Sequence, residues 1–495
     1  MNTYIGIDLG TSAVKILLVD EKGSIISSLS KEYPVSYPQP GWSEQNPADW
    51  WGACLIGLEE LLEGQDKASV RGIGVAGQMH GLVILDDDDC EIRDCILWND
   101  GRTAEETEWL NTKIGKEKLS ELTANIAFAG FTAPKLLWLK KHEPENFAQI
   151  AKIMLPKDYI NYKLTGVHSC DYSDASGMLL LDVKNRCWSK EMLGICDVRE
   201  DQLPRLFESY ECIGNIKPSI AFALGLSEDI KVCAGAGDNA AAAVGTGTVG
   251  NGACNISIGT SGTVFISQES FSVDPMNALH SFAHADGGYH LMGCMLSAAS
   301  CNKWLCEDIL GTDDYAAEQK DITDGELGRN EVFFLPYLMG ERSPINDTDA
   351  RGTLTGLSLK TQRKDIVLAV MEGVAFALRD SFEVAKSLGL DITSSRLCGG
   401  GAKSPLWRKV LANILGIPLQ IPLSEEGPGF GAAMLAMCAC GEYDNIRDCA
   451  DALTGVKETV LPDAEVSARY EERYDKFKKI YPAMKSLFKD LRPAR

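Results

Sequence analysis

The segment Ile5-Gly6-Ile7-Asp8-Leu9-Gly10-Thr11-Ser12 is informative about the fold because a related segment returns about half a chain later. Its apolar residues predict a strand, and its Gly-Thr-Ser end predicts a tight turn into a second strand over residues 14–19. The related stretch is Ile256-Ser257-Ile258-Gly259-Thr260-Ser261-Gly262, which again precedes an apolar run. Two copies of one strand–turn–strand unit predict two similar α/β domains.

Two domains also follow from the length of 495 residues, because a single core stops growing at roughly 250 to 300 residues. The segment 235–252 between the two copies is rich in Gly and Ala. We place the boundary there and expect domains 1–250 and 251–495. Strands around one helix at the start of the chain predict a mixed sheet. The expected fold class is α/β, with two mixed-sheet domains that face a central cleft.

The composition argues against several classes of function. A formal net charge of −22 is unsuited to a nucleic-acid surface, which needs clustered Lys and Arg, and no run is apolar enough to cross a bilayer. The 16 cysteines are scattered, which favours reduced thiols over a disulfide framework or a zinc site. Residues 1–8 run into a strand pattern without an export signal, so we expect a cytoplasmic protein.

Both Gly-Thr-Ser turns offer what a nucleotide phosphate needs, namely glycines for close approach, successive N–H donors and hydroxyl groups. We therefore expect phosphates near Thr11 on the first turn, and near Gly259 and Thr260 on the second. An ordinary hairpin turn is the alternative for either copy alone. Asp8, at the end of the first strand, could bind Mg²⁺, which prefers oxygen ligands, or could simply cap the turn.

A glycine cluster at Gly399-Gly400-Gly401-Ala402 follows a short strand and opens a helix. Backbone without side chains can approach a flat base or a ribose, and the start of a helix can receive polar atoms. We therefore expect Gly400, Gly401 and Ala402 at the nucleotide. A plain strand–helix turn would have the same composition.

Asp238 is the acid that we expect to act as a general base. It stands where a strand passes through glycines into a helix of small residues, 237–242, and these small neighbours leave room for a ligand beside the carboxylate. Such a base could take a proton from a sugar hydroxyl as this hydroxyl attacks a phosphoryl group. The alternative is that Asp238 is a helix N-cap, a common position for Asp.

Other polar residues follow strand-like segments. Gln78 and His80 end the strand at 71–76, at the edge where open sheets bind ligands. Asp100 offers a further group for sugar hydroxyls, or it caps the helix that starts near residue 103. His280, His284 and His290 share one stretch and could pair on a helix, but without an acidic ligand they do not indicate a metal site.

In this order, the segments resemble the carbohydrate kinases of the FGGY family over essentially the whole chain. The resemblance is carried by residues 5–12, 130–138, 237–241, 259–262 and 399–407. The family belongs to a ribonuclease-H-like group that shares its ATPase fold with hexokinase, actin and heat-shock chaperones. The resemblance implies ATP and Mg²⁺ as cofactors, and a small-molecule sugar as the other partner.

The resemblance also implies roles for single residues. It makes Asp238 the base, with Asn239 beside it, and makes Asp8 an acid that is needed at the metal and the phosphates. Met79 and His80 become sugar contacts. The residues implied around ATP are Thr260, Gly400 and Gly401, with Trp304 as a further candidate.

Within the family, five segments are most similar to the members that phosphorylate D-xylulose, which implies D-xylulose 5-phosphate as the product. They are residues 42–45, 77–81, 98–102, 155–159 and 340–344. Met79-His80 stands where glycerol kinases carry Arg-Glu, which argues against glycerol. Another sugar or polyol, such as ribulose or gluconate, stays open, and so does a non-catalytic ATP-dependent sugar-binding regulator. The sequence leaves the oligomeric state open, with a homodimer as one possibility.

Overall fold

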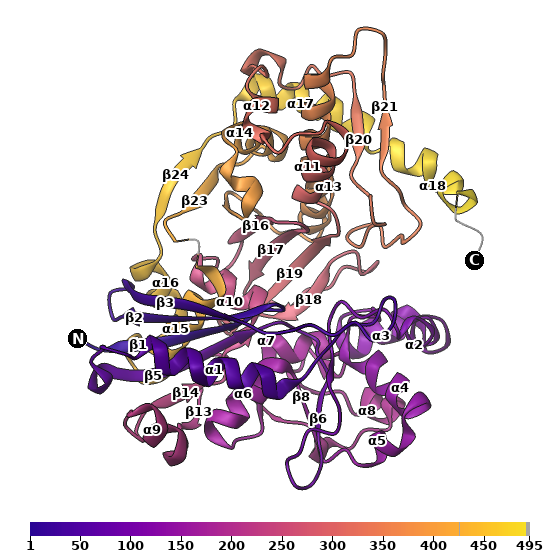
Figure 1. Ribbon diagram of the computed structural model, residues 1–495. Coiled ribbons are helices and arrows are strands. Elements are labelled where there is room, and N and C mark those ends of the chain that lie inside the picture. The colour runs from indigo at the N-terminus through magenta and orange to yellow at the C-terminus, as the bar shows by residue number, and fades with distance from the viewer. Residues whose placement is uncertain (425, 492–495) are drawn as a thin grey trace.

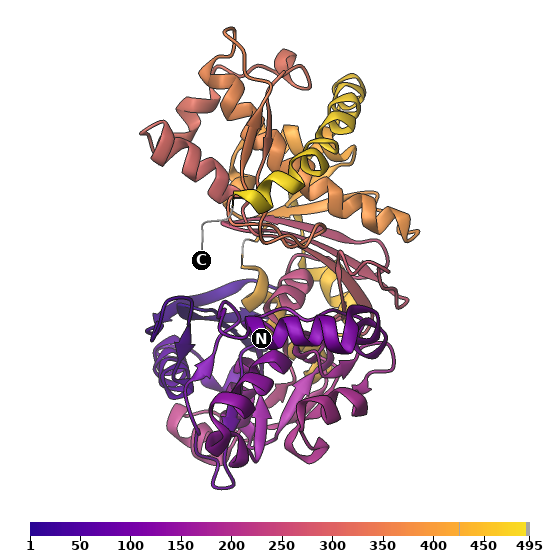
Figure 2. The same cartoon turned by 90° about the vertical axis from the view of Figure 1, so that its right-hand side faces the viewer.

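The computed structural model describes residues 1–424 and 426–491, and it consists of two lobes. Figure 1 shows one lobe made mainly from the first half of the chain, in indigo and magenta, and a second made mainly from the second half. The view turned by 90° shows the same two lobes one above the other (Figure 2). Within the described residues, no helix combines the length and the apolar character that crossing a bilayer requires.

The first lobe is built on a mixed sheet of seven strands. Its order is β13-β14-β5-β1-β2-β3, with β15 also paired to β5. The strands are β1 (Thr3–Leu9), β2 (Ala13–Asp20), β3 (Ile25–Glu32), β5 (Val70–Gly77), β13 (Cys212–Asn215), β14 (Lys231–Cys233) and β15 (Ala236–Gly237). β1 runs antiparallel to β2 and parallel to β5, as the hairpin and crossover pattern predicts.

The second lobe repeats this arrangement. Its sheet has the order β18-β19-β17-β16-β22-β23-β24. The strands are β16 (Cys254–Ile258), β17 (Gly262–Gln268), β18 (His280–Ala283), β19 (Tyr289–Met295), β22 (Ser395–Cys398), β23 (Leu419–Pro422) and β24 (Val456–Val460). From β3 to β13 and from β19 to β24, the directions of neighbouring pairs follow one series: antiparallel, antiparallel, parallel, parallel, antiparallel. The repeated strand–turn–strand unit therefore marks two related sheets, and the predicted α/β fold with two mixed-sheet domains is confirmed.

Helices and short strand pairs complete both lobes. The helices before the second sheet are α1 (Pro47–Leu61), α2 (Ala104–Trp109), α3 (Lys116–Thr123), α4 (Thr132–His142), α5 (Pro144–Ala148), α6 (Pro156–Thr165), α7 (Tyr172–Ala175), α8 (Lys190–Cys196), α9 (Pro218–Leu224) and α10 (Asp238–Gly245). The later ones are α11 (Ala299–Lys303), α12 (Tyr315–Gln319), α13 (Arg363–Ser387), α14 (Pro405–Leu415), α15 (Gly427–Cys440), α16 (Ile446–Leu453), α17 (Ala464–Phe477) and α18 (Ile480–Asp490). The short pairs are β4 (Glu44–Gln45) with β7 (Cys95–Ile96), β6 (Val83–Leu85) with β8 (Lys152–Met154), β9 (Ser169–Asp171) with β12 (Arg205–Phe207), β10 (Leu181–Asp182) with β11 (Cys187–Trp188), and β20 (Phe333–Leu335) with β21 (Thr353–Thr355).

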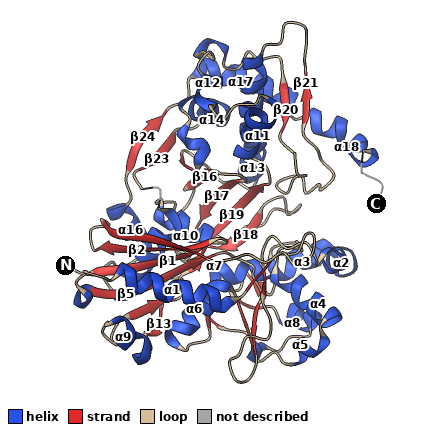
Figure 3. Cartoon of the chain, viewed as in Figure 1, coloured by secondary structure: helices blue, strands red, loops and turns tan. Residues whose placement is uncertain are grey.

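Each sheet has its own apolar core. Trp50 and Leu58 of α1 pack with Ile16 of β2 and other strand residues in the first lobe. In the second lobe, the buried face of α13 packs with residues of β16, β17 and β19. Figure 3 shows the strands β16 to β19 between the helices of the second lobe and the first lobe, so this sheet lies at the junction.

Helix α15 comes late in the chain but packs on the first sheet. Gly6 of β1 and Gly74 of β5 lie against its backbone, and an added Cβ at either position would overlap with a carbonyl oxygen of the helix. Helix α10 lies beside α15 (Figure 1), where Gly431 meets the backbone of Ala241 just as closely. The chain therefore returns to the first lobe after residue 426. The domain boundary at residue 250 stays a prediction from the sequence.

Candidate active site

The three parallel strands of the first sheet bring the predicted catalytic residues to one edge. In the register of the sheet, Asp8 of β1 and Ala236 of β15 both pair with Ala76 of β5. The residues that follow these strands therefore leave the sheet at the same end. They are Gly10 and Thr11 after β1, Gln78, Met79 and His80 after β5, and Asp238 and Asn239 after β15. Such an edge is where open α/β sheets bind ligands.

Asp8 and Asp238 are the two acids of this edge. Burial raises the pKa of Asp238 to about 6. Burial also raises the pKa of Asp8 to about 7, and the negative charge of Asp238 adds to this shift while Lys15 opposes it. Each acid is thus close to its ionisation point at neutral pH, as suits a group that must exchange a proton or meet a cation.

The backbone and amide of Asn239 hold the carboxylate of Asp238. Its Oδ1 accepts hydrogen bonds from the Asn239 backbone N–H at 2.7 Å and from Asn239 Nδ2 at 3.0 Å. Helix α10 begins at Asp238 itself, with Gly237 as its N-cap, and no side-chain cap is formed there. The alternative in which Asp238 is an N-cap is therefore excluded.

The chemistry of this edge fits a magnesium ion shared with nucleotide phosphates. Mg²⁺ is usually held by one or two carboxylates together with phosphates and water rather than by an all-protein cage. Asp8 supplies a half-buried carboxylate beside a second one, and the described residues contain no cluster of three or more metal-ligating side chains. Lys15, the cation that acts on Asp8, is paired with Glu426. A cation bound at Asp8 would offset the repulsion between the two acids.

His80 lies at the same edge in an unusual conformation. Its φ is 69°, and its Nδ1 lies 2.8 Å from the carbonyl oxygen of Gly177. Its ring is tilted against Phe131, with 4.6 Å between the centroids. Burial, followed by the charge of Lys135, lowers the pKa of His80 to about 3. His80 is therefore a neutral imidazole that can exchange hydrogen bonds with a sugar hydroxyl.

Lys135 is a functional candidate that the sequence reasoning missed. It is buried on α4, and its Nζ donates to the carbonyl oxygens of His80 and Gly130, both at 2.8 Å. Thr132 Oγ1 also donates to the His80 carbonyl at 3.1 Å. These bonds hold His80 in its left-handed conformation. The available signal was a lysine inside the apolar stretch 133–138, where an unpaired charge would be costly.

The other predicted sugar contacts differ in accessibility. Met79 is buried against Gly237, directly before Asp238. Gln78 is buried as well, and its Nε2 donates to Gln45 at 3.0 Å, so it supports the Thr11 turn, whose carbonyl accepts from Gln45 Nε2 at 2.7 Å. Gln78 Oε1 has no hydrogen-bond partner among the described residues, and the sugar contacts of Gln78 and Met79 stay predictions.

Asp100 is held by groups of the protein itself. Its side chain is buried, pairs with Arg102 at 2.6 Å and accepts from the Ser43 backbone N–H at 2.6 Å. The Arg102 guanidinium in turn lies 3.7 Å from the ring centroid of Trp42. Asp100 anchors a loop, and its role as a sugar contact stays a prediction.

The three clustered histidines do not form a helical pair. His280 lies on β18, His284 follows this strand, and His290 lies on β19. They pack among Phe265 and Phe282, with His290 stacked on Phe265 at 4.0 Å. They form an aromatic layer between the lobes.

The second sheet places the predicted nucleotide residues at the equivalent edge. β16 and β22 are parallel, with Ser257 paired to Cys398, so the Gly259-Thr260 turn and the Gly399–Ala402 cluster leave the sheet side by side. Gly399 has a φ of 86°, and a Cβ there would lie 2.6 Å from the carbonyl oxygen of Ile258. A Cβ at Gly400 would meet no protein atom within 4 Å. Gly400 thus presents open backbone to a ligand.

Three further residues predicted at the nucleotide, Thr11, Ala402 and Trp304, contact other parts of the protein. Thr11 Oγ1 accepts a hydrogen bond from Trp98 Nε1 at 3.0 Å. Ala402 is buried in the turn that follows Gly400. Trp304 is half-buried and stacked with Phe334 at 6.1 Å, against the core of the second lobe. Their contacts with ATP stay predictions.

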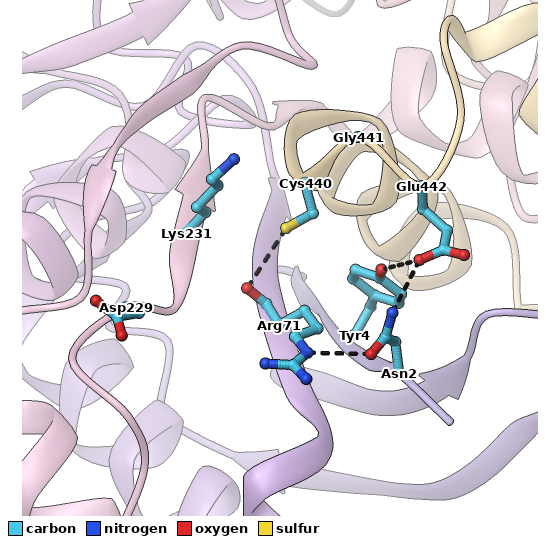
Figure 4. A pocket seen from close by; sticks show the side chains of 8 residues that line it. All are labelled: Asn2, Tyr4, Arg71, Asp229, Lys231, Cys440, Gly441 and Glu442. Carbon is cyan, nitrogen blue, oxygen red and sulfur yellow. Dashed lines mark hydrogen bonds between the residues drawn. The ribbon is translucent and has the colours of Figure 1, made fainter.

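One pocket lies away from this chemistry. It has a volume of about 400 Å³ and is lined by Asn2, Tyr4, Arg71, Asp229, Lys231, Cys440, Gly441 and Glu442. Figure 4 shows these side chains around the starts of β1, β5 and β14, where Tyr4 and Asn2 bond to Glu442. The pocket is thus at the opposite end of the strands from Asp8 and Asp238, and we assign it no part in the reaction.

Comparisons with known proteins agree with this geometry. Models of the FGGY family of carbohydrate kinases match residues 3–245 with the N-terminal domain and residues 254–440 with the C-terminal domain. A xylulose kinase of Escherichia coli (strain K12) is 41% identical over 480 residues, covering 97% of this chain and 98% of the relative.

Solved structures of sugar kinases superpose on this chain. The crystal structure of a "xyloylose kinase" from Brucella ovis superposes with a TM-score of 0.94 at 40% identity, covering 98% of this chain and 100% of the other. A gluconate kinase from Lactobacillus acidophilus also superposes with a TM-score of 0.94, at 27% identity over 99% of this chain and 100% of the other.

The two related mixed sheets give the architecture, and the family models and relatives identify an ATP-dependent sugar kinase. The chain belongs to the FGGY family of carbohydrate kinases. The family expected from the sequence is confirmed, and with it the use of ATP and Mg²⁺.

Proposed function

We propose that this chain transfers the γ-phosphoryl group of ATP to D-xylulose and forms D-xylulose 5-phosphate, with Asp238 as the general base. The observation that carries the proposal is the position of Asp238. It is held by Asn239 at the common edge of β1, β5 and β15, and its pKa is raised to about 6. The resemblance to xylulose kinases of similar length supports the choice of sugar.

In this proposal, the sugar lies beside His80 with its terminal hydroxyl at Asp238. The carboxylate accepts the proton of this hydroxyl as the oxygen attacks the γ-phosphorus and ADP leaves. His80, kept neutral by burial, exchanges hydrogen bonds with another sugar hydroxyl. Because the acceptor and the base share one edge, positioning supplies much of the rate.

The phosphates of ATP would lie between the two turns. Thr11 and Asp8 belong to the first lobe, and Gly259 and Thr260 to the second. Mg²⁺ bound at Asp8 would neutralise charge on the β- and γ-phosphates. The base and ribose would lie over Gly400 and Gly401, of which Gly400 is open and Gly401 packs against Ile258 and Trp407.

A substrate panel tests the proposal. The purified chain with ATP and Mg²⁺ is assayed for ADP release with D-xylulose, ribulose, gluconate, xylitol and glycerol. We expect the highest kcat/KM with D-xylulose. A higher value with gluconate would move the assignment to another member of the same family, and no turnover with any of the compounds would favour the regulator alternative. A homodimer and a cytoplasmic location remain predictions from the sequence.

A further inference from the structure

Aromatic rings connect His80 to a residue of the second lobe. The His80 ring lies against Phe131, and Phe131 contacts Phe128 edge-on at 5.4 Å. The guanidinium carbon of Arg342 lies 5.1 Å from the centroid of Phe128. His280, of the second sheet, also meets Phe128, at 5.0 Å. This group of rings therefore links His80 of the first lobe to Arg342 of the second.

The Arg342 guanidinium forms no ion pair with any carboxylate of the described residues. Its neighbours are the face of Phe128 and the thiol of Cys294, both weak partners for a cation. The adjacent Glu341 attracts it electrostatically but forms no ion pair with it. One carboxylate oxygen of Glu341 accepts from the backbone N–H groups of Leu296 and Arg342, and the other has no hydrogen-bond partner among the described residues. A half-buried guanidinium without a strong acceptor is costly unless a ligand supplies one.

The loop that carries Arg342 is anchored to the second sheet. The Ser343 backbone N–H donates to the carbonyl of Cys294 on β19 at 2.9 Å. Cys294 in turn pairs with Thr263 of β17, directly after the Gly259–Gly262 turn. Arg342 is thus placed by the same lobe that we expect to bind the nucleotide.

We propose that Arg342 is a substrate-binding residue that the second lobe contributes to the sugar site, where its guanidinium donates hydrogen bonds to the carbonyl and hydroxyl oxygens at the C1–C2 end of the ketose. This inference rests on the proposed function and deepens it. A guanidinium only donates and a ketose carbonyl only accepts, so the two are complementary. The C5 hydroxyl then lies at Asp238, toward the phosphates.

The electrostatics of the neighbouring histidines agree with this placement. Burial is the main cause that lowers the pKa of His80, and the positive charges of Lys135 and Arg342 add to it. Burial, then Arg342, then His80 lower the pKa of His280 in the same direction. The charge of Arg342 therefore acts on the space that His80 lines.

Steady-state kinetics of the full chain test the role of Arg342. In Arg342→Met, which keeps the aliphatic stem and removes the donors, we expect the KM for D-xylulose to rise at least about tenfold, as for loss of charge-assisted hydrogen bonds. The KM for ATP should stay within about threefold. Arg342→Lys should fall between wild type and Arg342→Met. Arg351→Met is the matched control and should behave as wild type, because Arg351 is an exposed residue of the same loop whose side chain, among the described residues, bonds only to nearby backbone carbonyls.

A D-xylulose KM within twofold of wild type in Arg342→Met, or an equal rise in both KM values, would overturn the inference. Calorimetric titration of D-xylulose without ATP separates this failure from failure of the proposed function. If the wild type binds the sugar without phosphorylating it, the proposed function fails, and weaker binding by the variant still supports Arg342. If the wild type does not bind the sugar, both fail. Arg342→Lys carries the test if thermal melting shows that Arg342→Met does not fold.

Discussion

The two lobes share one strand order but differ in what leaves the ends of their parallel strands. In the first lobe, the carboxylate of Asp8 stands near the end of β1, which ends at Leu9, and that of Asp238 directly follows β15. In the second lobe, Gly259 directly follows β16, and Gly400 follows the end of β22 at Cys398. One scaffold can thus supply a charged, proton-accepting edge in one lobe and a bare backbone edge in the other. If so, substitutions at the two edges should affect different substrates.

Removing the base should have the largest effect. We expect Asp238→Ala to lower kcat by about 10³-fold or more, because the variant lacks the proton acceptor. Thermal melting should show a folded protein, since α10 takes no side-chain cap from Asp238. ATP binding, measured by calorimetry, should be kept because the second lobe supplies the nucleotide edge. A kcat within tenfold of wild type would contradict the assignment of chemistry to the first lobe.

The ionisation of Asp238 gives a second measure of the same edge. Because burial raises its pKa to about 6, the carboxylate is protonated as the pH falls through that value. We expect kcat/KM for the sugar to be constant above pH 7 and to fall about tenfold per pH unit below 6. A rate that is unchanged down to pH 5 would exclude Asp238 as the titrating base.

His80 should affect the sugar and leave the nucleotide unaffected. For His80→Ala we expect the KM for D-xylulose to rise about tenfold, since one hydrogen-bonding group is lost, with the KM for ATP almost unchanged. His142→Ala is a suitable control because His142 lies at the end of α4, with its side chain largely exposed. Equal changes in both KM values would break the division between the lobes.

Gly400 tests the opposite edge. Because an added Cβ there meets no protein atom within 4 Å, a larger side chain should leave the fold intact and obstruct only a ligand. We expect Gly400→Val to raise the KM for ATP by about tenfold and to leave the KM for the sugar within twofold. Gly194→Val is the control, because Gly194 of α8 is equally open but lies in the first lobe. An unchanged KM for ATP would place the nucleotide elsewhere.

The sequence predicts these edges better than it predicts their support. Asp8, Asp238 and the glycine turns stand in local strand–turn patterns, so their positions follow from short segments. The packing of α15 on the first sheet depends on Gly6 and Gly74, which lie more than 350 residues away in the chain. The contact of Asp100 with the Ser43 backbone N–H, and that of Lys135 with the His80 carbonyl, likewise depend on tertiary contacts that no local pattern shows.

The smallest expected effect concerns the free energy of unfolding, and it can be measured at the Asp238 edge without any substrate. The folded protein holds the pKa of Asp238 at about 6, above its ordinary value of 3.8, so the unfolded chain ionises first as the pH rises from 4 to 6. Folding stability attributable to this group therefore falls over that window and stays lower at pH 8. Asp238→Asn removes the charge and should raise the free energy of unfolding by about 1 kcal/mol at pH 8, because the site is half-buried and partly screened. The gain should shrink as the pH is lowered toward 5. Urea unfolding at both pH values, with exposed Asp229→Asn as the control, measures it. No gain at pH 8 would mean that the buried Asp238 carboxylate does not lower the stability of the fold. The edge with Asp8 and Asp238 would then differ from the edge with Gly259 and Gly400 only in the chemical groups that it presents.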